Sequence, residues 1–291
     1  MITYFIDLFS KHDKESRNAL ITDSHLHTIH FSSDAKMTID ELFVAAELAG
    51  LSAVVLTEHF DDDFPHDLPV PLIFDIPTFF ESLAKWRQTC PPLLSLRAGI
   101  EFGYQPQLAE KYELIARSFP FDSVILSNHL IGGVDPFIYR DCYSMSKSDL
   151  HFTYINSLAD MAERCTFYDI LGHYDYIVRY SPHKDPTMRY TDCPAAFDRL
   201  FRILISSEKS LEINTRTINK LQQLGLDNCF PDREILDRYL ELGGTRITLG
   251  SDSHDPSTLA WRFEDTMTYL KKIGFRDNTS YVGRKEIRTP F

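Results

Sequence analysis

Long apolar runs and targeting signals are missing from this sequence. No stretch approaches the roughly 20 consecutive apolar residues that a membrane-spanning helix needs. Residues 1–20 lack the basic start and the apolar core of a signal peptide. Low-complexity tracts, Gly/Ser linkers and sequence repeats are also missing. We therefore expect a cytoplasmic protein with no membrane partner.

Cysteine is scarce, and its spacing argues against two common uses. The cysteines are odd in number, and no two of them form a Cys-x-x-Cys pair. A disulfide framework usually needs an even set, and many structural metal sites need paired cysteines. The pattern indicates reduced thiols in the cytosol, at Cys90, Cys142, Cys165, Cys193 and Cys229.

Positive charge is also in short supply. The chain has 30 Lys and Arg residues against 42 Asp and Glu residues, which gives a formal net charge of −12. General nucleic-acid binding requires a basic surface, so we expect no nucleic-acid partner. The acidic excess is either an ordinary solvated surface or is partly neutralised by bound metal.

Short apolar segments alternate with longer amphipathic ones along the 291 residues. The apolar segments predict buried strands at 20–24, 53–57, 123–127, 211–214 and 247–250, with two more ending at 100–101 and 170–172. The amphipathic segments predict helices at 77–89, 107–118, 148–164, 194–207, 232–242 and 259–273. A capping box at Thr38 and Glu41 predicts the start of another helix, which ends before Gly50.

Strands that alternate with helices predict an α/β protein with a parallel sheet. About seven such units, with no change of composition along the chain, favour a single domain that forms a closed or nearly closed (β/α)7 barrel. We expect this domain to cover 21–291, preceded by an extension at 1–20. An open, doubly wound sheet is the alternative. The long proline-containing loops at 61–75 and 180–192 are candidates for functional segments.

Ionisable residues recur at the carboxyl ends of the predicted strands. The carboxyl ends of parallel barrel strands share one face, where the active sites of such barrels form. We therefore expect these side chains to gather on that face. They are Asp23, His25, His27, Glu58, His59, Glu101, His129, His173, Glu212, Asp252 and His254.

Imidazole nitrogens and carboxylate oxygens are the ligands that zinc, manganese and iron take in proteins. Residues two apart in a strand point the same way, so His25 and His27 are predicted to bind one metal together. The same holds for Asp252 and His254 if their segment stays extended. Without a cation, so many buried charges and imidazoles on one face would repel or lie unsatisfied.

Taken singly, each residue has an ordinary structural explanation. A lone histidine at a strand end, such as His129 or His173, is more often hydrogen-bonded than metal-bound. Glu101 could cap a helix, and Glu212 could pair with an arginine. The histidines away from strand ends are interpreted as surface residues, with His183 a weak candidate for a lid: His12, His66, His151 and His183.

The strand-end motifs follow one another in a fixed order. They are Asp-Ser-His-Leu-His-Thr at 23–28, Leu-Thr-Glu-His-Phe at 56–60, Gly-Ile-Glu-Phe at 99–102, Ser-Asn-His at 127–129, Leu-Gly-His-Tyr-Asp at 171–175, Leu-Glu-Ile-Asn at 211–214 and Gly-Ser-Asp-Ser-His at 250–254. This ordered set resembles the PHP (polymerase and histidinol phosphatase) superfamily, and within it the histidinol-phosphate phosphatase branch.

The resemblance implies a distorted barrel of seven strands with a site for three divalent metal ions. The first ion would be held by His25, His27, Glu101 and Asp252. Glu101 would also bind the second ion, completed by His129 and His173, and the third would be held by His59 and His254. A further ligand is expected after the His-x-His motif, for which Asp34 is the preferred match and His30 the alternative. Glu58 replaces the aspartate of many members and is expected to lie behind the ligands.

The predicted reaction is hydrolysis of a small phosphate ester, for which the resemblance implies L-histidinol phosphate in histidine biosynthesis. A hydroxide between two metals would attack phosphorus, with Glu101, Asp252 and His254 as catalytic residues. Zinc, iron and manganese all suit the ligands. By their place near the catalytic face, Arg179 and Arg216 are candidate phosphate ligands. Asp175 or Glu58 is a candidate for orienting a metal-bound histidine from behind.

Two rival functions stay open at this point. A nuclease or nucleotide phosphatase could use the same scaffold, although the acidic charge argues against long nucleic acids. A non-catalytic metal-binding or regulatory domain is the other rival. A decayed site should have lost several ligands, whereas only one ligand position in this sequence is ambiguous. The oligomeric state is not predicted.

Overall fold

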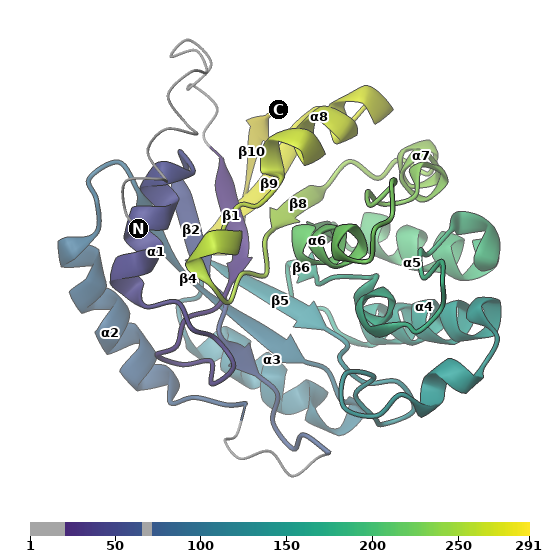
Figure 1. The fold of residues 1–291 in the computed structure, drawn as a ribbon. Coiled ribbons are helices and arrows are strands. Elements are labelled where there is room, and N and C mark those ends of the chain that lie inside the picture. Colours follow the sequence, from purple (N-terminus) through teal and green to yellow (C-terminus); the bar gives the residue numbers. More distant parts are fainter. Residues whose placement is uncertain (1–20, 66–71) are drawn as a thin grey trace.

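A nearly closed barrel of seven parallel strands, wrapped by helices, forms the centre of the protein (Figure 1). The computed structural model describes residues 21–65 and 72–291. Neighbouring strands follow chain order, apart from the two-residue β3 (His59–Phe60), which pairs with β4. The barrel strands are β1 (Thr22–Leu26), β2 (Ala53–Leu56), β4 (Ser95–Gly103), β5 (Ser123–Ser127), β6 (Ile170–Leu171), β7 (Ser210–Asn214) and β8 (Ile247–Gly250).

The barrel closes between its last strand and its first, just beyond the end of β8. The Asp252 amide donates to the His25 carbonyl at 2.7 Å, and the His27 amide donates to the Ser253 carbonyl at 2.9 Å. The Ser251 amide donates to the Asp23 carboxylate at 2.9 Å. The predicted barrel is confirmed, and the open doubly wound sheet is wrong. This closure brings residues near 252 beside residues near 25.

Helices cover the outside of the barrel (Figure 1). The predicted capping box starts the first of them, since Thr38 Oγ1 accepts from the Glu41 amide and the Glu41 carboxylate accepts from the Thr38 amide. No helix of the described residues is long and apolar enough to cross a membrane. The helices are α1 (Ile39–Leu48), α2 (Ile76–Thr89), α3 (Ala109–Ser118), α4 (Lys147–Arg164), α5 (Pro194–Ser206), α6 (Thr215–Gln223), α7 (Arg233–Glu241) and α8 (Phe263–Ile273).

Most element boundaries differ from the sequence-based expectation by a residue or two, and three elements differ in ways that have a structural reason or concern the site. Helix α6 was not predicted; it follows β7 without a loop, with the Asn214 side chain accepting from the Arg216 amide at 3.0 Å as its cap. Helix α8 begins at 263 and not at 259, because Ala260 and Arg262 have positive φ angles of 49° and 58°. The first strand covers 22–26, two residues later than expected, and residues 1–20 lie outside the described part of the chain.

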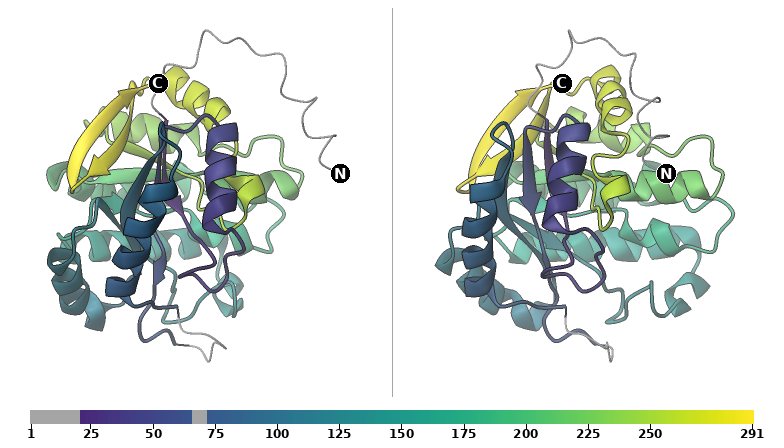
Figure 2. Two further views of the ribbon diagram at one scale, coloured as in Figure 1. Left: turned by 90° about the vertical axis from the view of Figure 1, so that its left-hand side faces the viewer. Right: turned by 60° about the vertical axis from the view of Figure 1, so that its left-hand side comes forward.

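A carboxyl-terminal hairpin, also not predicted, covers the opposite end of the barrel from the predicted site. It consists of β9 (Asp277–Val282) and β10 (Lys285–Pro290), and Figure 2 shows it along one side of the molecule. The Tyr281 hydroxyl hydrogen-bonds the Ser210 hydroxyl, 2.8 Å away at the start of β7. The buried Asn278 Oδ1 accepts from the Leu249 amide of β8 at 3.0 Å. These contacts shield the starts of the barrel strands.

Replacement of Asn278 tests the contribution of this hairpin. Asn278→Ala leaves the buried Leu249 amide without its acceptor, which should lower the free energy of unfolding by about 1–3 kcal/mol. Urea denaturation measures this change. Lys285→Ala, at an exposed position of β10, is the control and should change stability by less than about 0.5 kcal/mol. Equal stabilities of the two variants would contradict the assigned role.

Candidate metal centre

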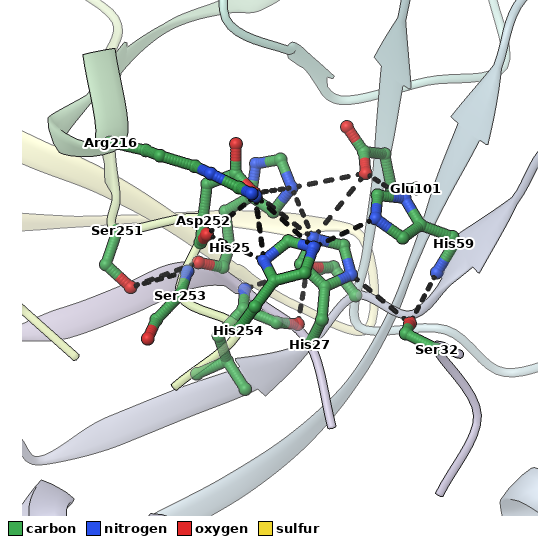
Figure 3. Close-up of polar contacts among 12 residues, drawn as sticks. His25, His27, Ser32, His59, Glu101, Arg216, Ser251, Asp252, Ser253 and His254 are labelled. Atoms are coloured by element: carbon green, nitrogen blue, oxygen red, sulfur yellow. Dashed lines mark hydrogen bonds and ion pairs between the residues drawn. The ribbon is translucent and has the colours of Figure 1, made fainter. Parts of the chain in front are cut away.

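Glu101 lies at the middle of the predicted site and joins its two halves. Strand β4 delivers this carboxylate fully buried to the barrel mouth. Its Oε1 is 2.9 Å from His173 Nε2 and 3.3 Å from His129 Nε2. On the other side, Oε2 is 2.8 Å from His59 Nδ1. The Nε2 atoms of His25 in β1 and of His27 just after it lie 3.4 and 3.6 Å away. Figure 3 shows Glu101 among its imidazole neighbours.

Six imidazoles around Glu101 form three pairs whose Nε2 atoms face each other. These Nε2–Nε2 distances are 3.1 Å for His25 and His27, 3.2 Å for His59 and His254, and 3.3 Å for His129 and His173. Two nitrogens bound to one tetrahedral zinc lie about 3.3–3.4 Å apart, because each Zn–N bond is about 2.0–2.1 Å. Within the described residues, three groups of ligand atoms have spacing that could hold an ion: His27–His59–His254, His25–His27–Asp252 and Glu101–His129–His173.

The electrostatics of the cluster favour ligand forms. Burial alone would raise the pKa of Glu101, but the imidazoles around it, His25 and His129 foremost, hold that pKa well below its ordinary value. Burial and the neighbouring His59 and His254 lower the pKa of His27. Glu101 is therefore an anion and His27 a neutral imidazole, as metal ligands must be. Apart from the 2.8 Å contact with His59 Nδ1, which lacks the geometry of a hydrogen bond, Glu101 Oε2 has no hydrogen-bond partner within the described chain, so a cation fits this position.

Asp252 and His254 do not lie in an extended segment, so the prediction that they bind one metal together, which required such a segment, does not apply. Strand β8 ends at Gly250, and Asp252 adopts a left-handed backbone with φ of 51°. This turn leaves Asp252 Oδ1 3.6 Å from His254 Nδ1 but directs the two side chains towards different partners. Asp252 Oδ1 lies 3.5 Å from His27 Nε2 and 4.0 Å from His25 Nε2, whereas His254 faces His59. They therefore serve different ligand groups.

Asp34, and not His30, joins the cluster. Asp34 Oδ2 is 3.0 Å from His254 Nε2 and 3.6 Å from His59 Nε2. The exposed His30 accepts from the Ile39 amide at 3.4 Å and lies 5.0 Å, ring centre to ring centre, from Trp86. Of the two alternatives that the sequence left open, only Asp34 reaches the imidazoles.

Two carboxylates hold the histidines from behind. Glu212 Oε1 is 2.7 Å from His25 Nδ1, and Oε2 accepts from the His173 amide at 2.6 Å. Asp61 Oδ1 is 2.6 Å from His129 Nδ1. Such contacts fix the tautomer so that Nε2 faces a metal. The sequence placed Glu212 but missed Asp61, although its position two residues after His59 was the available signal.

Glycines at the strand ends make room for these two carboxylates. A Cβ on Gly250 would lie 2.1 Å from Glu212 Oε1 and 2.6 Å from His25 Cβ. A Cβ on Gly103 would lie 1.8 Å from Asp61 Oδ1. Any side chain at either position would displace the carboxylate behind a histidine, so both positions require glycine for close approach.

Glu58 acts on the cluster through a serine. Its fully buried carboxylate accepts from the Thr28 amide at 3.0 Å and from Ser32 Oγ at 2.6 Å. Burial raises the pKa of Glu58 to about 7, although these hydrogen bonds oppose the rise. Ser32 Oγ is in turn 3.4 Å from His27 Nδ1. The carboxylate thus lies behind the imidazoles and touches His27 only by way of Ser32.

Asp175 contacts an arginine system and not a metal-ligand imidazole, so its suggested role beside a histidine is wrong. Asp175 Oδ1 accepts from Thr217 Oγ1 at 3.0 Å, and Thr217 Oγ1 accepts from Arg179 Nε at 2.9 Å. Arg179 Nη1 continues to Asp252 Oδ2 at 2.7 Å. Arg216 Nη1 reaches the other oxygen of Asp252 at 3.0 Å. Both candidate arginines therefore flank one carboxylate of the cluster.

A cavity of about 470 Å³ opens above the cluster. Its floor includes His59, His129, His173 and Asp252, and both arginines reach it. Its outer wall is aromatic and acidic, with Asp135, Phe137, Tyr176 and Tyr180. This wall was not predicted, because Asp135 and Phe137 lie between the predicted elements.

Two other described histidines, His151 and His183, lie away from the cluster. His151 is buried, not exposed as expected, and its Nδ1 is 2.8 Å from Asp192 Oδ2. His183 is partly buried and does not line the cavity. His12 and His66 fall outside the described residues. The described part of the 61–75 loop contributes Asp61, Phe64 and Leu72 to the cavity, whereas the 180–192 loop contributes only Tyr180.

Fold and site together define a class of protein: a seven-stranded β/α barrel with buried imidazoles and carboxylates at the carboxyl ends of its strands. The chain belongs to the PHP domain family, whose model matches residues 23–216, about two thirds of the sequence. Asp252 and His254 lie beyond the matched residues, and barrel closure brings them to the site.

Relatives with assigned names cover almost the whole chain. A probable histidinol-phosphatase of Clostridium acetobutylicum is 31% identical over 88% of this chain and 95% of its own length. The histidinol-phosphatase of Lactococcus lactis is 29% identical over 90% of this chain and 95% of its own. The crystal structure of the histidinol phosphate phosphatase from Lactococcus lactis, complexed with zinc, L-histidinol and phosphate, superposes with a TM-score of 0.80 at 27% identity, covering 92% of this chain and 99% of the other.

Asp34 and His30 can be separated by metal analysis. Asp34→Ala should lose about one bound ion per chain, because it removes a ligand atom beside His59 and His254. His30→Ala should keep the metal content of the wild type. Elemental analysis of purified proteins by mass spectrometry measures both. Metal loss in His30→Ala but not in Asp34→Ala would reverse the assignment.

Proposed function

We propose that this protein is a metal-dependent phosphatase that hydrolyses L-histidinol phosphate to L-histidinol and phosphate. The observation that carries the proposal is the position of Glu101, a buried carboxylate with one oxygen directed at each of two imidazole clusters. Two metals that share a ligand are the usual arrangement for hydrolysis of phosphate esters. The named relatives support the choice of substrate.

Three divalent ions fit the ligand groups. We assign the first to His25, His27, Glu101 and Asp252, and the second to Glu101, His129 and His173. The third is assigned to Asp34, His59 and His254. His27 belongs to two of the three ligand groups, because its Nε2 lies close to the ligand atoms of both. We assign His27 to the first ion because the facing His25 Nε2 is only 3.1 Å away. Zinc in the Lactococcus lactis structure supports zinc among the candidates zinc, iron and manganese.

Bound divalent ions lower the pKa of water towards neutrality and neutralise phosphate charge. The protein's own side chains hold the geometry. Arg216 and Arg179 fix both oxygens of Asp252, and we infer that their remaining N–H groups bind phosphoryl oxygens. Burial and the charge of Arg216 lower the pKa of His254, which keeps that imidazole neutral. We therefore give Glu101, Asp252 and His254 the catalytic roles of holding the reacting groups in place.

The cavity wall suits the proposed leaving group. L-histidinol carries an imidazole ring and an ammonium group. The rings of Phe137 and Tyr180 lie 5.2 Å apart, centre to centre, and offer a surface on which an aromatic ring can pack. Asp135 provides negative charge on the same wall. A small nucleotide would place further phosphates or a sugar against Asp135, which makes it the second candidate substrate.

Hydrolysis of L-histidinol phosphate by the purified protein tests the proposal. Wild type, loaded with zinc, manganese or iron, should release phosphate, and His25→Ala and Asp252→Ala should lose at least about 100-fold in kcat/KM because each removes a ligand. Phosphate release is measured by a colorimetric assay together with the metal content of each sample. Release from nucleotides but not from L-histidinol phosphate would favour the second candidate. Metal binding without any turnover would favour a non-catalytic domain.

Arg179→Lys tests whether the paired N–H groups of the Arg179 guanidinium bind the substrate. Lysine keeps the charge but loses the paired N–H groups, so KM should rise about tenfold or more while the metal content stays unchanged. Steady-state kinetics on L-histidinol phosphate measures the effect. Arg202→Lys, an exposed arginine paired with Asp198, is the matched control. An unchanged KM in Arg179→Lys would remove Arg179 from the substrate site.

A further inference from the structure

Arg179 is held on three sides in the cavity wall. Its Nε donates to Thr217 Oγ1 at 2.9 Å, its Nη1 donates to Asp252 Oδ2 at 2.7 Å, and its Cζ lies 5.5 Å from the centre of the Tyr176 ring. The side chain is only 1% exposed. A guanidinium is planar, so contacts at Nε and Nη1 together fix the direction of the third nitrogen, Nη2.

Thr217 holds the Nε edge of that guanidinium, and Asp175 holds Thr217. A hydroxyl has a single proton. Thr217 donates that proton to Asp175 Oδ1 at 3.0 Å, which turns the oxygen lone pairs towards Arg179 Nε. Thr217 and Asp175 are both buried, so water does not compete for these bonds. The carboxylate therefore sets the orientation of the hydroxyl, and the hydroxyl sets that of the guanidinium.

The third nitrogen of Arg179 is the one without a hydrogen-bond partner. Nη2 is buried, and none of the residues that the structure describes accepts from it. A buried N–H group without an acceptor costs free energy, which an incoming anionic oxygen would recover. Arg179 lines the cavity together with Asp252 and His173. Its unsatisfied donor is thus beside the groups that would surround a phosphoryl group.

We propose that Thr217 and Asp175 are positioning residues, which hold the Arg179 guanidinium so that Nη2 meets a phosphoryl oxygen of the substrate. The inference rests on the proposed phosphatase function. It also distinguishes the two arginines, because Arg216 Nη1 contacts only Asp252 and His254 and its side chain is 31% exposed. Loss of the Thr217 hydroxyl should therefore weaken phosphate binding through Arg179 alone and leave the metal ligands in place.

Thr217→Val removes the hydroxyl with little change in shape. Thr215→Val is the matched control, since Thr215 is on the same helix, is equally buried, and its Oγ1 has no hydrogen-bond partner within the described residues. The dissociation constant for inorganic phosphate is measured by calorimetry on metal-loaded protein, alongside KM, kcat, metal content and melting temperature. Thr217→Val should raise the phosphate Kd and the KM about tenfold, the loss expected for one hydrogen bond to a charged group.

Further variants separate positioning from packing. Thr217→Ser keeps the hydroxyl and should recover most of the phosphate affinity. Asp175→Asn, which keeps the shape of the carboxylate, should raise the phosphate Kd by about threefold. If Thr217→Val fails to fold or loses metal, Asp175→Asn takes its place as the test. Thr215→Val should stay within about twofold of the wild type.

Two results would overturn the inference. One is a phosphate Kd for Thr217→Val within twofold of the wild type, and the other is an equal loss in Thr215→Val, which would assign the effect to packing. Either result, with active wild type, leaves the proposed phosphatase function intact. Wild type that neither binds phosphate nor hydrolyses the ester would instead overturn the proposed function, and this inference with it.

Discussion

Six imidazoles and two carboxylates crowd together at the carboxyl ends of the barrel strands, both carboxylates and four of the imidazoles buried, and this crowding is the constraint on which the rest of the site depends. Two imidazole nitrogens that face each other at 3.1–3.3 Å can share one proton, but the carboxylate oxygens of Glu101 and Asp252 beside them then lack a donor. A shared cation satisfies both nitrogens. The surrounding structure is arranged accordingly, with carboxylates behind the imidazoles and arginines only at the outer edge.

The barrel makes this crowding possible by collecting short segments from the whole chain. His25 and Asp252 are 227 positions apart in sequence, yet the Asp252 amide donates to the His25 carbonyl where the barrel closes. The left-handed backbone at Asp252 then directs its carboxylate towards His27, while His254 Nε2 faces His59. Glycine at 103 and 250 gives the carboxylates of Asp61 and Glu212 the space in which to hold His129 and His25. Backbone geometry therefore decides which ligand serves which group.

Much of this arrangement could be predicted from the sequence. Strand-end residues such as Glu101 and His173 were identifiable because parallel strands bring their carboxyl ends together. The sequence could not choose between Asp34 and His30, because both follow the His-x-His motif in a loop whose path depends on tertiary contacts. It missed Asp61 and the hydroxyl of Thr217, since a side chain that acts on another side chain leaves no periodic pattern. The terminal hairpin was missed as well, because its strands lie outside the alternating β/α series.

The most direct test of the account is to locate metal in the protein itself. Crystals of the purified protein, measured at the X-ray absorption edges of zinc, iron and manganese, give anomalous difference maps that identify each ion by element. The account predicts peaks between the facing nitrogens of His25 and His27 and of His129 and His173, one on each side of Glu101. A map with no peak beside Glu101, from protein supplied with all three metals, would contradict it.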